Sequence, residues 1–297
     1  MRLPVRRPGS RPLPALLAVI AAVLTPAAHA QIQPITTETR PASAADLPRW
    51  EGGVLLAALT IPDYPASDES RHLVLPVPYF IYRGRVLRAD DNGSRLRRRL
   101  APNLEIDISG GGSLSSDASD TDARRGMPDL DYLVELGPNL RLSYPGPHPK
   151  SLIVVNLPVR GVVSVGSDLG WQGLRFAPEL AYVNERFLDG RLALNASLVS
   201  EFASERLQRY FYEVEPVYAT PERPAYRASA GYLGSSLGAR AWYSFTPSLR
   251  GLISVRWYNH DGAANEDSPL FRRANGYSAT IGLAWSFLRS SERAAED

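Results

Sequence analysis

The sequence predicts an all-β protein, an antiparallel transmembrane β-barrel of the outer membrane with about twelve strands, or ten as the alternative. Apolar and polar residues alternate in many segments with the period of two that a strand requires. Aromatic residues stand at both ends of the apolar face in the last such segment. Short and long connections also alternate, as expected if the short turns are periplasmic and the long loops external. A soluble β-sandwich, the competing fold, has no reason to show this asymmetry.

The segment from Gly276 to Leu288 shows the pattern most clearly. Its alternate positions are the apolar residues Tyr277, Ala279, Ile281, Leu283, Trp285 and Phe287, and those between are Ser278, Thr280, Gly282, Ala284 and Ser286. Because successive side chains in a strand point to opposite faces, one face is apolar and the other is small and wettable. Tyr277 at one end and Trp285 with Phe287 at the other match the aromatic girdles of an outer-membrane strand.

Residues 1–30 have the features of a cleavable signal peptide. Arg2, Arg6, Arg7 and Arg11 form a basic region, Ala15 to Leu24 is apolar, and Ala28-His29-Ala30 is an A-x-A cleavage site. The apolar run is shorter than the roughly 20 residues that a membrane-spanning helix needs. We therefore expect export in a Gram-negative cell. Residues 31–48 are rich in Thr, Pro and Ala without periodicity, which predicts a disordered lead-in.

Composition excludes several classes of protein. The whole chain carries a net charge of +2, and removing the four arginines of the signal segment leaves −2. Binding nucleic acid needs a basic face, so we expect no nucleic-acid partner. Without cysteines, stability must come from packing and hydrogen bonds, which a closed barrel supplies. A hydrophobic content of 44% with a mean hydropathy of −0.19 suits strands that expose only alternate residues to lipid.

The barrel is expected over residues 49–288, followed by a charged tail over 289–297. The expected strands are Glu51–Thr60, Leu73–Tyr82, Arg85–Ala89, Ser94–Leu100, Asn103–Ser109, Tyr132–Tyr144, Leu152–Ser164, Leu174–Val183, Leu192–Phe202, Arg227–Phe245, Leu249–Trp257 and Gly276–Leu288. Asp91-Asn92-Gly93 predicts a tight hairpin. Proline cannot donate to a ladder, so Pro76 and Pro78 predict an irregular or protruding strand. The remaining segments are loops, the longest of them Gly110–Asp131 and Ser204–Tyr226.

We expect no catalytic, cofactor-binding or metal-binding residues. His72 near Ser70, or His260 near Asp261, could belong to the Ser/His or Asp/His set of a barrel hydrolase, but the plainer interpretation is a solvated loop histidine. No two histidines have metal-ligand spacing.

Two loop segments carry charges of both signs. The acidic residues Asp117, Asp120, Asp122, Asp129 and Asp131 surround Arg124 and Arg125. Oxygen-rich loops can hold Ca²⁺, but this spacing matches no EF-hand, so we expect a loop held by its own Asp–Arg pairs. Glu222-Arg223 has the same ambiguity. These loops could plug the lumen or bind a partner.

A set of charged residues falls on the polar face of the predicted strands and so points into the lumen. These are Glu105, Asp107, Glu135, Arg141, Arg175, Glu179, Arg250 and Arg256. They predict either a self-paired polar lumen or a channel lining that tunes selectivity. A barrel of about twelve strands is narrower than the 16–18-stranded porins, so we expect a narrow or plugged lumen.

Five segments, in this order, resemble one known family. They are Leu59–Glu69 (LTIPDYPASDE), Pro76–Gly84 (PVPYFIYRG), Ala123–Asp131 (ARRGMPDLD), Ala219–Tyr226 (ATPERPAY) and Glu266–Leu270 (EDSPL). They are similar to the MipA/OmpV family of MltA-interacting outer-membrane proteins. The resemblance implies an outer-membrane barrel without established catalytic residues. The chain departs from the usual aromatic ending, because ten residues follow Phe287.

The resemblance also bears on function. One member of the family is described as a scaffold that joins a lytic murein transglycosylase to a murein synthase, and others are described as pores or adhesins. We therefore expect a non-enzymatic scaffold protein in peptidoglycan metabolism, whose partners are outer-membrane lipid, a murein transglycosylase and a murein synthase. A narrow porin-like pore for small solutes and a surface adhesin are the alternatives. The oligomeric state is left open.

Overall fold

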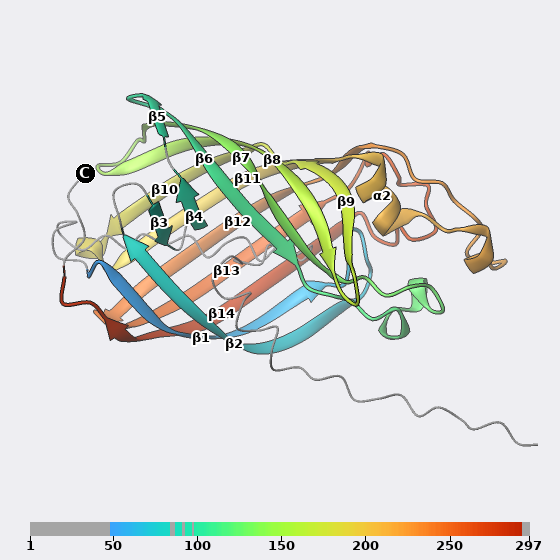
Figure 1. Cartoon of the computed structure of the whole chain (residues 1–297), viewed down its shortest axis with the longest axis horizontal. Coiled ribbons are helices and arrows are strands. Elements are labelled where there is room, and N and C mark those ends of the chain that lie inside the picture. Colours follow the sequence, from blue (N-terminus) through green and yellow to red (C-terminus); the bar gives the residue numbers. More distant parts are fainter. Residues whose placement is uncertain (1–47, 84–86, 91–92, 97, 293–297) are drawn as a thin grey trace, which may run out of the picture.

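The computed structural model describes residues 48–83, 87–90, 93–96 and 98–292, so the predicted signal peptide and most of the lead-in lie outside it. One antiparallel sheet contains the fourteen strands of these described residues (Figure 1). They are β1 (Trp50–Pro62), β2 (Ser70–Arg83), β3 (Leu87–Asp90), β4 (Gly93–Leu96), β5 (Arg98–Ala101), β6 (Leu104–Ser113), β7 (Tyr132–Pro145), β8 (Ser151–Val165), β9 (Leu169–Phe176), β10 (Glu179–Phe187), β11 (Leu192–Ala203), β12 (Gly231–Thr246), β13 (Leu249–Asn259) and β14 (Asn275–Arg289).

The sheet curls round on itself because its first and last long strands pair. β1 pairs with β2 on one side and with β14 on the other, and Ala58 lies opposite Ile281. From β14 the order continues through β13, β12, β11 and β10 to β8, β7, β6 and β5. At the other end of this path, β4 lies against β6. The predicted antiparallel barrel is therefore confirmed.

Two features explain why the number of strands depends on how segments are counted. β9 and β10 occupy one place in the barrel, since both pair with β8 and with β11. The break falls at Ala177 and Pro178, where proline cannot donate to the ladder; the expected strand Leu174–Val183 is thus two strands. The predicted hairpin near Asn92 forms, with Asp90 opposite Gly93, although residues 91–92 lie outside the described part.

The outer surface has the predicted apolar band and aromatic girdles. Along β14, Ile281 and Trp285 point outward, and both are more than half exposed. Trp257 lies opposite Tyr277 at one end of β13 and β14. At the other end the rings of Trp285 and Phe287 are 5.3 Å apart. This arrangement matches a strand with its apolar middle in hydrocarbon and its aromatic ends in the two interfaces.

Among the described residues no ladder joins β2 to β6, because β3 and β4 follow β2 in the order of the sheet and β4 lies against β6. Pro76 and Pro78 lie opposite Leu56 and Val54 of β1. In an antiparallel pair, residues that exchange hydrogen bonds need an N–H, so both prolines occupy non-hydrogen-bonded positions toward β1. Their missing donors therefore lie on the edge of β2 that is turned away from β1. The register between β1 and β2 is unbroken from Trp50 to Pro62, so the prediction of an irregular or protruding strand is wrong.

The connections divide between the two ends of the barrel. Residues 146–150, 188–191 and 247–248 make short turns at one end, which also carries the end of β14. The longer connections gather at the other end, where helix α2 (Glu205–Tyr212) lies (Figure 1). The expected loop Val165–Gln172 is shorter than predicted, because β9 starts at Leu169. β12 starts at Gly231 rather than at Arg227, because the preceding residues belong to the loop that follows α2.

Helices are few and short. The 3-10 turns are η2 (Ala118–Asp120), η3 (Asp122–Arg124), η4 (Leu188–Gly190) and η5 (Pro216–Tyr218). No helix in the described ranges is long and apolar enough to cross a bilayer. Helix α2 was not predicted. Leu207 and Phe211 are four residues apart and both are buried, which is the spacing of neighbours on one helix face.

Candidate functional site: the charged lumen and its loop cap

Charged residues from four strands form a connected network inside the barrel. Arg175 on β9 lies between two carboxylates, 3.3 Å from Glu135 on β7 and 3.0 Å from Glu201 on β11. Arg160 on β8 approaches Glu135 to 3.7 Å. Glu135 is only 2% exposed and Arg175 only 4%. Both side chains are buried, so each charge needs its partner, because an unpaired charge in the interior lowers the stability of the fold.

The other predicted inward charges also have partners. Arg250 lies 3.9 Å from Glu51 and over the ring of Trp242, and Arg256 donates to Ser236. A second polar chain runs along β6 to β10. Asp107 accepts from Asn139, and Glu179 accepts from Asn156. The interpretation of a self-paired lumen agrees with this geometry. The sequence did not identify the partners Glu51, Arg160 and Glu201. The register between strands determines which side chains become neighbours, and the sequence alone does not give that register.

The inner wall formed by β1 and β2 is apolar, which was not predicted. Leu55, Ala57 and Leu59 of β1 point inward, opposite Val77, Leu75 and Leu73 of β2. The β1 side chains are buried, whereas those of β2 are half-buried. Trp242, Leu252 and Ala284 extend this cluster along the neighbouring wall. The lumen therefore has an apolar stretch on β1 and β2, with the Glu51–Arg250 pair at its edge, in addition to the charged network.

The long connections pack into a cap over one end of the barrel. We define the cap as residues 63–69, 114–131, 204–230 and 260–274. Its apolar core contains Tyr64, Leu130, Leu207, Phe211, Tyr212, Val214, Ala228 and Leu270, and rests on the barrel residues Leu133, Val162, Ala203 and Leu233. These residues come from four connections, so each loop is held by the others. Four of the five segments that resemble the family lie wholly or largely in the cap.

Buried polar groups fix the cap loops to one another. The Tyr64 hydroxyl donates to the Leu270 carbonyl over 2.8 Å, and the Tyr212 hydroxyl donates to the Pro65 carbonyl over 3.0 Å. Burial raises the pKa of both tyrosines, so both hydroxyls keep their protons. Arg124 donates to the carbonyls of Phe211 and Pro128 and lies over the Tyr64 ring. Burial lowers the pKa of this guanidinium.

The acidic stretch does not form one cluster. Asp122 pairs with Arg125, while the Asp129 carboxylate accepts from the backbone of Ala118. Arg124 turns away into the cap core, so the expected Asp–Arg pairing holds for Arg125 only. Within the described ranges, no three acidic or histidine side chains gather as metal ligands would. Asp117 and Asp120 lie in or next to the turn η2, and Asp131 accepts a hydrogen bond from Tyr210 through its carbonyl.

Glu222 and Arg223, the second charged pair of loop residues, have different surroundings. Arg223 donates to the carbonyls of Tyr218, Ala123 and Arg125, which joins two cap loops. Glu222 is exposed. Beside them, a groove of about 620 Å³ runs between the first of these loops and α2. Its charged lining includes Arg209, which pairs with Glu205 and Glu213.

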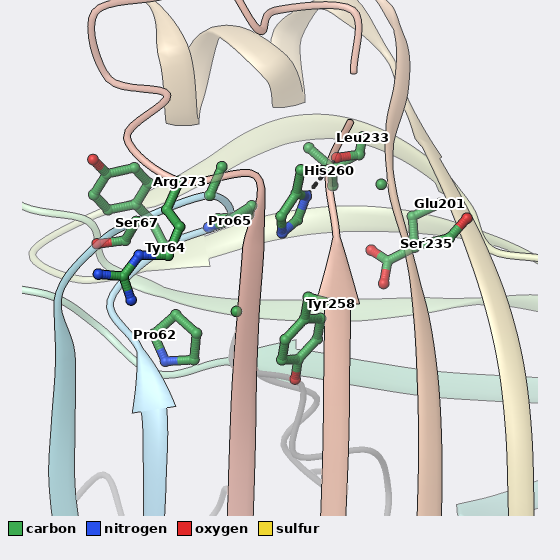
Figure 2. Close-up of a pocket in the computed structure, with 13 residues that line it drawn as sticks. Pro62, Tyr64, Pro65, Ser67, Glu201, Leu233, Ser235, Tyr258, His260 and Arg273 are labelled. Carbon is green, nitrogen blue, oxygen red and sulfur yellow. Dashed lines mark hydrogen bonds between the residues drawn. The ribbon is translucent and has the colours of Figure 1, made fainter. Parts of the chain in front are cut away.

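The two candidate histidines have different surroundings. His72 lies on the outward face of β2, where its Nδ1 is 2.7 Å from the Thr60 hydroxyl. His260 lies at the end of β13 and is buried under the cap, so the expectation of a solvated loop histidine is wrong for it. Figure 2 shows it above Tyr258, with its ring turned to the Leu233 carbonyl. That carbonyl only accepts, so Nδ1 carries the proton. Asp261 is exposed and accepts from Asn259 instead.

The space around His260 is small. A cavity of about 20 Å³ is lined by Tyr64, Ser67, Glu201, Ser235 and Tyr258 (Figure 2). That volume suffices for one water molecule. Gly234 passes so close that a Cβ there would lie 2.4 Å from the His260 Nδ1, at a backbone φ of +151° that favours glycine. Burial lowers the pKa of His260, opposed by the Leu233 carbonyl and by Asp261.

Comparison with solved structures finds low overall similarity. A bacterial polysaccharide outer membrane secretin aligns with TM-score 0.36 and 8% identity over 82% of this chain and 100% of that one. Outer membrane phospholipase A from Escherichia coli aligns with TM-score 0.31 and 11% identity over 79% and 92%. The Salmonella typhi OmpF complex with daunomycin aligns with TM-score 0.33 and 11% identity over 80% and 97%. Similarities this low assign no function.

The comparison with protein families assigns the chain, whereas the comparisons with curated proteins and with solved structures do not. No curated protein matches the chain. The family described as MltA-interacting protein MipA matches residues 54–287, from within β1 to the closing part of β14. That range takes in most of the paired first and last strands, all the lumen charges described above except Glu51, and the whole cap. The chain is therefore a member of the MipA family of MltA-interacting proteins, and it is an outer-membrane β-barrel.

Proposed function

We propose that this protein is a non-enzymatic scaffold of the outer membrane that docks a lytic murein transglycosylase and a murein synthase at its periplasmic end. The family name supports an interaction with the murein enzyme MltA. The observation that carries the rest is the pairing of the lumen charges beneath a packed cap. Carboxylates and guanidiniums that pair with each other are less available to act on a substrate, and the packed cap covers one end of the lumen.

The short-turn end is the surface that faces the periplasm in this proposal. There Leu188 stands on a turn with a positive φ of 49° and is 63% exposed. At the opposite end Val217, in the cap, is 76% exposed. These two residues form a matched pair for locating the docking face, because both expose an apolar side chain and neither supports the core.

The test is a pull-down of the native protein from detergent-solubilised envelopes, read by mass spectrometry. We expect a murein transglycosylase or synthase to be retained, less of it with Leu188→Arg, and an unchanged amount with Val217→Arg. Retention of neither enzyme by the wild-type protein would contradict the scaffold proposal. Conductance steps in planar bilayers that change with Arg250→Glu or Arg256→Glu would instead support a narrow pore.

A further inference from the structure

The groove between the loop 114–131 and α2 has the size of a small-molecule site. Its volume of about 620 Å³ lies within the range of about 300–1,000 Å³ that is usual for such sites. The apolar part of its lining includes Met127, Pro128 and Leu130 from the loop. The acidic part comes from both sides of the groove and consists of Asp129, Glu205, Glu213 and Glu215.

The arginines in the lining offset these four carboxylates only in part. Arg124 is 4% exposed and donates to two backbone carbonyls of the cap core. Arg209 lies between Glu205 and Glu213, at 2.7 and 3.0 Å. Arg206 is exposed and forms no ion pair with a residue that the structure describes. Two guanidiniums therefore reach the open groove, against four carboxylates.

The carboxylates are distributed along the groove. Glu205 begins α2 and Glu213 follows its last residue, so their backbones lie about 12 Å apart at about 1.5 Å of rise per residue. Asp129 lies on the facing loop, where it accepts from the Ala118 backbone. A single metal ion needs oxygens that converge on one point. Carboxylates at separate points instead suit a ligand that carries several separate positive charges.

Two aromatic rings and the charge of the whole cap favour a cation as well. Tyr210 and Tyr218 line the groove, and the face of an aromatic ring attracts a cation. The cap contains fifteen acidic side chains and eight arginines, a net charge of −7 with His260 neutral. A concave surface within a field of one sign raises the local concentration of ions of the opposite sign.

We propose that this groove binds a small organic polycation, of the class of the aliphatic polyamines, at the outer surface of the cell. The ammonium groups pair with Asp129 and Glu215, neither of which forms an ion pair with another described residue. The methylene segments lie against Met127, Pro128 and the tyrosine rings. The groove opens outward because the long connections of an outer-membrane barrel are external. This inference is independent of the scaffold proposal.

Isothermal titration calorimetry of the full-length protein in detergent micelles, with spermidine as the probe, tests the proposal. We expect saturable binding of one spermidine per chain, which added salt weakens. Glu215→Gln and Asp129→Asn should each weaken the binding about threefold to fivefold, the modest effect of losing one exposed ion pair. Glu222→Gln is the matched control, because it removes the same charge from an exposed cap residue outside the groove. It should leave the affinity unchanged.

Arg206→Gln supplies a second arm, since it removes a cation from the groove and keeps every carboxylate. Spermidine should bind this variant about threefold to fivefold more tightly, whereas Arg273→Gln, at an exposed cap position outside the groove, should have no such effect. A wild-type protein without saturable binding would overturn the proposal. Equal losses with Glu215→Gln and Glu222→Gln would show diffuse attraction to the cap and would also overturn it, as would displacement of spermidine by an equal concentration of Mg²⁺.

Discussion

Replacing Arg175 by methionine tests whether the lumen network is a structural requirement. The substitution keeps the volume and removes the cation between Glu135 and Glu201, leaving two buried carboxylates with Arg160 3.7 Å from one of them. Breaking a buried ion pair by removing one partner costs about 3–5 kcal/mol. The folded-to-unfolded ratio should therefore fall by about a hundredfold or more.

The assay is urea unfolding of the barrel in phospholipid vesicles, followed by the fluorescence of its five tryptophans. Arg125→Met is the matched control, because its pair with Asp122 is 70% and 76% exposed and should contribute less than about 1 kcal/mol. Combining Arg175→Met with Glu201→Gln should recover part of the lost stability, because glutamine removes one of the two carboxylates that Arg175 had paired with. An Arg175→Met barrel that unfolds at the same urea concentration as the Arg125→Met barrel would refute the reasoning.

Three further predictions concern the cap and the lipid face. Phe211→Ala should cost about 3–5 kcal/mol of cap stability and speed protease cleavage within 204–230 while the strands stay protected; cleavage at the wild-type rate would argue against a packed cap. The folded pKa of His260 is lowered, so the unfolded cap binds its proton first as pH falls below about 6.5, and stability should drop from there toward the lowered pKa. Amide exchange of the cap should show this drop in the wild type, and a drop of the same size in His260→Gln would exclude His260 as its source. Ile281→Arg, in the middle of the lipid-facing row, should destabilise the barrel by about 2–4 kcal/mol in vesicle unfolding, and a neutral result would place that face away from hydrocarbon.

The elements with a strict alternation could be predicted, because one apolar face and one polar face admit a single orientation in a membrane. β14 is the clearest case, since its girdle residues stand where the sequence placed them. The break at Pro178 and the missing donors at Pro76 and Pro78 follow from residues visible in the sequence. Which neighbouring strand lies on the side of each proline's missing N–H depends on the pairing register, which cannot be read from the sequence alone.

The candidate site was only half predictable for the same reason. The inward direction of Glu135 and Arg175 follows from strand period, but their meeting with Glu201 depends on four neighbouring strands, β7, β8, β9 and β11. Helix α2 was missed because it is eight residues long and carries its apolar signal on Leu207 and Phe211 inside a polar loop. The burial of His260 depends on cap packing, a long-range effect that local composition does not reveal.

The segments that flank the first and last strands, at Arg49 and at Ser290 to Glu292, meet beyond the last girdle. The backbone N–H of Arg49 donates to the Glu292 carbonyl, that of Ser290 donates to the Trp50 carbonyl, and the side chains of Arg49 and Glu292 lie 2.8 Å apart. These contacts join positions 243 residues apart, a closure whose entropic cost is about 5 kcal/mol by chain statistics. Ser290 to Glu292 therefore extend the closure of the barrel past the end of the β1–β14 ladder. Without these three residues the ladder itself would remain, but the Trp50 carbonyl and the Arg49 guanidinium would lose the partners that they have there.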